Sequence, residues 1–268
     1  MAYGKGWKRD APGQEWSLAR HRFGAPLNLA RESLALIDYV LNVENQGDMN
    51  ACVGYALGRA IHVRAQALKL NGTSDQPKPS YLSIYTEARR VEMHDPTEPL
   101  EDTGCAPFSA MQAIANIGVP KETTWPSDPE KVNVDLPWDD IQDAASFKIS
   151  GWHRIDAEGP SLSAAMAQPL VQPVPIPVIF GLDLWAAFED YSGGEIDSVG
   201  PDEKGGHMLC CLGFRTNQDG SRSFRVLNSW SASWGDKGWC WINERVLAAP
   251  RPDGSPRVSD VYAVEIHQ

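Results

Sequence analysis

The chain has 268 residues, 42% of them hydrophobic, so it can bury one sizeable core as a single domain or as two lobes that share a cleft. Its net charge of −11 disfavours nucleic acid as a partner, because no basic stripe is present to neutralise phosphates. No apolar stretch is long enough to cross a membrane, and residues 1–22 lack the apolar core of a secretory signal peptide. We therefore expect neither nucleic acid nor a membrane as a partner.

The first part of the chain predicts helices. Residues 1–30 are mixed and loop-like, and we interpret them as a short leader. Apolar residues at helical spacing begin at Val53 and continue until an Asn-Gly pair at 71–72. A second helix is predicted from the Ser80 cap, and a third from about Pro107 to Gly118.

The second part predicts strands separated by glycine and aspartate turns, with short helices around 161–168 and 184–191. We expect a single α+β domain, with a mainly helical lobe at about 31–140 and a mainly β lobe at about 141–268. The predicted strands are 147–150, 174–182, 207–214, 224–228, 239–242 and 261–266.

Cysteine usage points to a reducing environment. The five cysteines are an odd number and include no C-x-x-C pair of the metal-binding type. Cys210 and Cys211 are adjacent on a predicted strand and would point to opposite faces. We expect free, buried thiols, no metal site and no cofactor. The same pattern favours a cytoplasmic location, with delivery to another cell or compartment by a non-classical route left open.

Four residues have the local contexts that nucleophilic catalysis needs. Cys52 opens a predicted helix, where the helix dipole and unpaired backbone N–H groups favour a thiolate. His207 begins an apolar strand and can exchange a proton with the thiol. Asn228 can orient the imidazole, and Gln46 can donate a hydrogen bond to an oxyanion.

Taken singly, each residue also has an ordinary structural explanation. Cys52 can be a small buried hydrophobe, and His207 a structural histidine. Asn228 can end a strand, and Gln46 can be a polar loop residue. Cys105 is the only rival nucleophile, but its sequence context is a loop.

Together, the segments around these residues resemble the papain-like cysteine peptidases, specifically the compact bacterial and viral members without a long propeptide. Residues 45–52 (NQGDMNAC) are similar to the segment that joins the oxyanion-hole amide to the nucleophile. Residues 205–209 (GGHML) resemble the histidine motif. Residues 228–230 (NSW), followed by 233–239 (SWGDKGW), resemble the asparagine motif and are the most specific signal.

The resemblance implies a papain-like two-lobe fold, with a helical left lobe, an antiparallel β-barrel right lobe and the active-site cleft between them. It implies Cys52 as the nucleophile, His207 as the acid and base, and Asn228 as the orienting residue. Gln46 would then be the oxyanion-hole donor. It also assigns Gly104 and Trp230 to substrate binding and implies a protein or peptide substrate. The oligomeric state is not indicated.

The chain departs from the family pattern near the nucleophile, where Asn50 replaces a glycine and Val53 an aromatic residue. Ser231 also stands where a glycine is usual. A cysteine endopeptidase is the leading hypothesis. An acyl or peptidyl transferase, a narrow processing protease and a non-catalytic binding module remain alternatives. For an enzyme without a long pro-segment, we expect either that residues 1–30 cover a lobe or that the substrate range is narrow.

Overall fold

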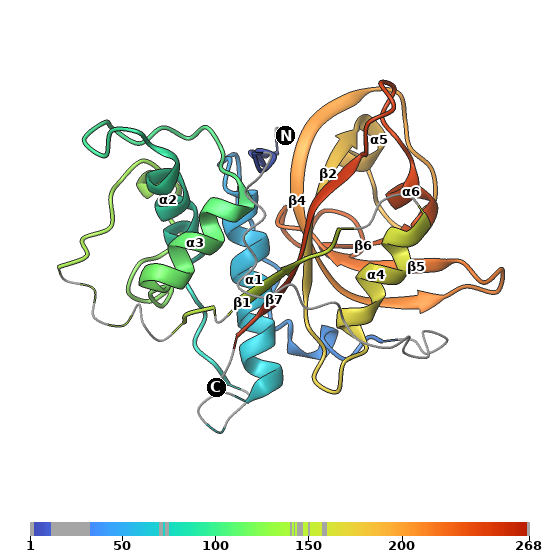
Figure 1. Cartoon of the computed structure of the whole chain (residues 1–268), viewed down its shortest axis with the longest axis horizontal. Coiled ribbons are helices and arrows are strands. Elements are labelled where there is room, and N and C mark those ends of the chain that lie inside the picture. The colour runs from blue at the N-terminus through green and yellow to red at the C-terminus, as the bar shows by residue number, and fades with distance from the viewer. Residues whose placement is uncertain are drawn as a thin grey trace.

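The computed structural model of the chain describes residues 3–11, 33–69, 72, 75–139, 141, 143, 147–149, 151–156 and 160–266. Helices α1 to α3 lie on one side of the molecule, and a curled sheet with α4 to α6 lies on the other (Figure 1). Residues 1–2 and 12–30 of the expected leader, which was placed at residues 1–30, lie outside the described residues. The architecture is α+β with two lobes, as the sequence predicts.

Local sequence signals explain the three long helices, which are α1 (Cys52–Leu68), α2 (Tyr81–Glu92) and α3 (Pro107–Ile117). The Ser80 hydroxyl accepts a hydrogen bond from Ser83 N and caps α2, as predicted. Gly118 ends α3 in a left-handed conformation, with φ of +85°. Helix α1 is buried along nearly its whole length because it packs against both α2 and α3 and against the sheet.

The second lobe is built on one seven-stranded sheet with the order β1-β7-β2-β4-β5-β6-β3. All neighbouring strands are antiparallel except β3 and β6, which run parallel. The sheet is therefore mixed, whereas a wholly antiparallel lobe was expected. The strands are β1 (Gly151–Arg154), β2 (Val178–Trp185), β3 (Glu195–Ile196), β4 (Glu203–Thr216), β5 (Arg222–Leu227), β6 (Trp239–Asn243) and β7 (Val258–Glu265).

Several predicted elements need correction. The strand expected at 147–150 is absent from residues 147–149, where Phe147 O instead accepts a hydrogen bond from Val119 N of the helical lobe at 2.9 Å. The ladder begins only at Gly151. Strand β3 and helix α6 (Glu244–Ala248) were not expected, and β4 is longer than predicted. The two short helices are α4 (Pro160–Leu170) and α5 (Ala186–Glu189).

The core includes all five cysteines, which are buried and free. This agrees with the expectation of free thiols, whereas the cytoplasmic location stays a prediction. Within the described part of the chain, no helix is both long and apolar enough to span a bilayer.

Candidate active site

Cys52 and His207 come from opposite lobes, and the residue that follows His207 contacts the Cys52 thiol where α1 faces β4. Cys52 is the first residue of α1 and is fully buried. Its Sγ accepts a hydrogen bond from the backbone N–H of Met208 at 3.5 Å. Since Met208 follows His207 on β4, the contact brings the thiol beside the strand that carries the imidazole.

The His207 imidazole is held by Asn228. His207 Nε2 lies 2.8 Å from Asn228 Oδ1, which also accepts the backbone N–H of Ser229 at 2.8 Å. His207 Nδ1 is buried and has no hydrogen-bond partner among the described residues. An acceptor at Nε2 favours the neutral tautomer with its proton on that nitrogen, which leaves a lone pair on Nδ1.

Trp230 covers the imidazole. The two rings are 4.6 Å apart between centroids, and the indole is almost fully buried. The ring of Tyr3 also stacks on this indole, with 4.4 Å between the two ring centroids. Trp230 therefore shields the contact between His207 and Asn228 from water and also touches the N-terminal segment.

Gln46 lies in the same buried group, six residues before the nucleophile candidate. Its side-chain nitrogen donates to Met49 O at 2.8 Å, and its oxygen accepts a hydrogen bond from the Ser229 hydroxyl. A primary amide has two N–H groups, so one donor is left after the contact with Met49. The amide is thus fixed next to the start of α1, as an oxyanion-hole donor requires.

Burial keeps both reacting groups neutral in this form. Burial raises the pKa of the Cys52 thiol to about 12, although backbone N–H groups of Met208, Val53 and Trp7 act in the opposite direction. Burial also lowers the pKa of His207 to about 4, although its hydrogen bond to Asn228 acts in the opposite direction. In this form desolvation outweighs the helix terminus, and the thiolate expected at Cys52 stays a prediction.

The N-terminal segment, residues 3–11, covers the loop that precedes Cys52. Gly4 N donates to Gly47 O at 2.9 Å, and Gly4 O accepts the indole N–H of Trp230 at 3.1 Å. Cys105 N donates to Gly6 O at 2.9 Å. Cβ atoms on Gly4 and Gly6 would come within 2.0 and 2.1 Å of backbone oxygens in the nucleophile loop. Glycine is therefore needed for so close an approach.

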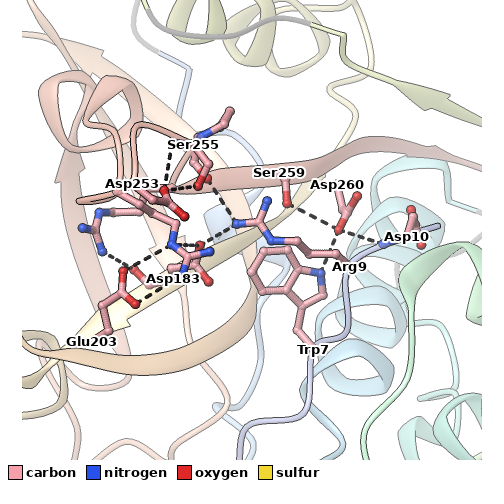
Figure 2. A network of polar contacts seen from close by, with 12 residues as sticks. Trp7, Arg9, Asp10, Asp183, Glu203, Asp253, Ser255, Ser259 and Asp260 are labelled. Carbon is pink, nitrogen blue, oxygen red and sulfur yellow. Dashed lines mark hydrogen bonds and ion pairs between the residues drawn. The ribbon is translucent and has the colours of Figure 1, made fainter. Parts of the chain in front are cut away.

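Side chains of the same segment anchor it to the β lobe. Figure 2 shows the indole of Trp7 directed at Asp260 and the guanidinium of Arg9 directed at Asp183. The distances are 3.0 Å for Trp7 Nε1 to Asp260 Oδ2 and 2.6 Å for the ion pair of Arg9. Asp10 receives hydrogen bonds from Phe108 N and from the Tyr262 hydroxyl. The segment is thus bound to both lobes across the cleft.

The N-terminal segment pairs with Cys105, the neighbour of Gly104, and the expected contact of Gly104 with substrate stays a prediction. Cys105 donates its N–H to Gly6 and accepts from Lys8 N at 3.1 Å, in a parallel bridge with Trp7. Gly104 lies against the same segment, since a Cβ there would come within 2.0 Å of Gly6 O. The Cys105 thiol is fully buried, and burial raises its pKa well above the ordinary value.

Two departures from the family pattern have simple structural explanations. Asn50 is not among the residues with positive φ, so it needs no glycine-like conformation. Its N–H and side chain are bonded instead to Asp102, which ties the nucleophile loop to the Gly104 segment. Ser231 does adopt the left-handed conformation, with φ of +66°. This conformation explains why glycine is usual at this position in the family.

Comparisons with known proteins show the family and the fold. The model of the papain family of cysteine proteases matches residues 96–249, more than half of the chain. The match contains His207 and Asn228 and begins after Cys52. An uncharacterized peptidase C1-like protein of Acanthamoeba polyphaga mimivirus is 26% identical over 216 residues, which cover 77% of this chain and 65% of that protein.

Solved structures show the same fold. Xylellain, a cysteine protease from Xylella fastidiosa, superposes with a TM-score of 0.75 at 21% identity over 99% of this chain and 97% of its own. The bromelain protease of Ananas comosus in complex with the E64 inhibitor gives 0.66 at 20% identity, over 88% of this chain and 100% of its own. The fold is papain-like. The chain belongs to the papain family of cysteine proteases.

Proposed function

We propose that this chain is a cysteine endopeptidase that hydrolyses peptide bonds through a thioester at Cys52, and that residues 3–11 hold it latent. One observation carries the proposal: Asn228 holds Nε2 of the His207 imidazole and leaves its Nδ1 without a partner, while the next residue, Met208, contacts the Cys52 thiol. A base oriented in this way, next to a thiol at a helix start, is suited to acyl transfer.

The chemistry follows from the hydrogen bonds. In the open form His207 Nδ1 takes the thiol proton, and Cys52 Sγ attacks the carbonyl carbon of the substrate. The oxyanion accepts hydrogen bonds from the Gln46 amide and the Cys52 N–H, which is one of the unpaired donors at the start of α1. His207 then protonates the leaving amine as the C–N bond breaks. Water attacks the thioester with His207 as base, which releases the acid and restores the thiol.

The covering segment is not itself oriented for cleavage. The carbonyl oxygen of Gly6 accepts from Cys105 N, and that of Gly4 accepts from Trp230, so neither is directed at the Gln46 amide. An acyl group whose oxygen lies away from the oxyanion donors is not activated for attack. The segment therefore blocks the thiol without being consumed.

Hydrolysis by variants of the full chain tests the proposal. The background protein for all variants is Gly6→Ala, in which the cover is displaced. The assay measures the peptides released from an unstructured protein substrate. Adding Cys52→Ala or His207→Ala is expected to reduce hydrolysis to background at unchanged melting temperature. Adding Cys105→Ala, which removes the rival thiol, is expected to leave hydrolysis in place. Residual activity in the Cys52→Ala variant would contradict the assignment.

Added amines separate hydrolysis from transfer. If the acyl-enzyme reacts mainly with water, a primary amine at millimolar concentration leaves free acids as the main products. Predominant amide products would identify a transferase that uses the same site. Mass spectrometry of the products decides between them.

A further inference from the structure

Asn228 holds His207 through only one end of its side-chain amide. Its Oδ1 lies 2.8 Å from His207 Nε2 and also accepts the backbone N–H of Ser229. Its Nδ2 is buried and makes no hydrogen bond with any of the described residues. Buried amide nitrogens almost always have a hydrogen-bond partner, so this end of the amide requires an explanation.

The hydroxyl of Tyr81, the first residue of α2, is a second atom of this kind. Tyr81 is fully buried, and its hydroxyl has no hydrogen-bond partner in the part of the chain that the structure describes. The nearby guanidinium of Arg59 does not supply one. It lies 5.7 Å from the centroid of the tyrosine ring and donates a hydrogen bond to Asn42 O at 2.7 Å.

Tyr81 and Asn228 line the same narrow crevice. The crevice lies between residues of α1 and α2 on one side and residues of β4 and β5 on the other, and Glu44 and Arg59 add to its polar lining. Its volume open to water is about 10 Å³, which is room for about one water molecule. Because residues 3–11 do not line it, displacement of that segment leaves the crevice in place.

Two glycines on one face of α1 allow Tyr81 to reach this crevice. A Cβ atom on Gly58 would come within 2.3 Å of the Tyr81 ring, and one on Gly54 within 2.5 Å of the Tyr81 carbonyl oxygen. Glycine is unfavourable inside a helix, so its use at both positions is explained by the close approach of Tyr81.

Resting on the proposed peptidase function, we propose that one water molecule binds between Asn228 Nδ2 and the Tyr81 hydroxyl, and that Tyr81 is thereby a positioning residue for Asn228 and His207. The amide N–H donates to the water oxygen, and the water forms a second hydrogen bond with the hydroxyl. Both ends of the amide are then held. The amide cannot turn its nitrogen toward Nε2 of His207, where two N–H donors would face each other.

A crystal structure of the full chain tests the water site without any need for hydrolysis. Electron density is expected for an ordered water within about 3.2 Å of both Asn228 Nδ2 and the Tyr81 hydroxyl. Density that shows no water within reach of both atoms would overturn the proposal. This measurement needs no variant, so it decides the matter even if Tyr81→Phe does not fold.

Turnover tests the positioning role in the Gly6→Ala background. Tyr81→Phe keeps the ring and removes only the hydroxyl. We expect kcat to fall by about three- to tenfold, the effect of one neutral hydrogen bond, and KM to stay unchanged because the buried Tyr81 does not touch substrate. Tyr55→Phe is the matched control, since Tyr55 lines the same crevice but its hydroxyl already donates to Asn45 O at 3.5 Å. Its kcat is expected to stay unchanged.

A double-mutant cycle separates positioning from general support of the fold. In a chain that carries Asn228→Ala there is no amide left to hold, so adding Tyr81→Phe is expected to cause no further loss of kcat. A loss by the same factor with and without Asn228→Ala would overturn the positioning role. The melting temperature, measured for each variant, reports any structural contribution of the hydroxyl separately.

The outcomes also separate this proposal from the proposed peptidase function. Peptide cleavage that Tyr81→Phe leaves unchanged overturns the role of Tyr81 and leaves the peptidase function in place. A water bound to both atoms in a chain that cleaves no peptide overturns the peptidase function and supports the water site.

Discussion

The side-chain oxygen of Asn228 lies 2.8 Å from Nε2 of His207, so a neutral imidazole carries its proton on Nε2 and leaves a lone pair on Nδ1. Ser229 N–H donates to the same oxygen and thereby fixes which end of the amide faces the ring. His207 Nδ1 is then ready to accept a proton as soon as the cleft opens.

Loss of this contact should reduce turnover without unfolding the protein. Asn228→Ala removes the acceptor, so the imidazolium formed during catalysis loses one hydrogen bond and its fixed orientation. We expect kcat to fall by about ten- to a hundredfold, the effect of one hydrogen bond to a charged group. Steady-state kinetics in the Gly6→Ala background measure it. Unchanged kcat would show that Trp230 alone holds the ring.

Displacement of the cover should expose the thiol. Gly6 has φ of +126°, and a Cβ there would come within 2.1 Å of Asn50 O, so Gly6→Ala must push the segment away. We expect alkylation of Cys52 by iodoacetamide to accelerate by about tenfold or more. Gly220→Ala is the matched control, because Gly220 also has positive φ but nothing within 4 Å. Equal acceleration in both variants would indicate general destabilisation.

The cover should also respond to pH through Asp10. Burial raises the pKa of Asp10 from 3.8 to about 6, and the Asp260 carboxylate adds to this effect. Hydrogen bonds from Tyr262 and Phe108 N and the charge of Arg154 lower the pKa but do not outweigh burial. Protonated Asp10 therefore stabilises the closed form below 3.8, and this contribution is lost as the pH rises through about 6. His207 acts oppositely, since its lowered pKa stabilises the closed form above 6.5 and the effect is lost as the pH falls through about 4.

Asp10→Asn isolates the first contribution, because it removes the titrating group and leaves His207 in place. The ratio of Cys52 alkylation rates, wild type over Asp10→Asn, is expected to be near one at pH 4 and to increase by pH 7. Alkylation measured at intervals across this range gives the ratio directly. A ratio that stays constant would mean that Asp10 does not titrate in the closed form.

Much of the fold could be predicted because its signals are local. Ser80, Pro107 and Gly118 mark helix ends within a few residues of chain. The two-residue strand β3 has no such pattern. It is held through Glu195, whose carboxylate accepts hydrogen bonds from Asn243 and Ser223 on other strands. A pairing of this kind depends on distant residues.

The candidate catalytic residues could be found for the same reason, since each lies in a distinct short segment. One of the two expectations was that residues 1–30 cover a lobe, but the contacts of residues 3–11 could not be predicted, because this segment has no apolar periodicity and its two glycines suggest only a loop. The contact of Trp7 with Asp260 joins residues 253 positions apart. The pair Gly4 and Gly6 was an available signal, because closely spaced glycines fit a backbone that passes very near another.

Mass spectrometry of the protein after reaction with an epoxide inhibitor tests the central claim most directly. The full chain with Gly6→Ala is treated at neutral pH, with and without His207→Ala, and the modified residue is mapped. We predict one epoxide adduct per chain, located at Cys52, and a large loss of labelling without His207. Labelling at Cys105, or labelling of Cys52 at the same rate in both proteins, would contradict a thiol activated by this imidazole.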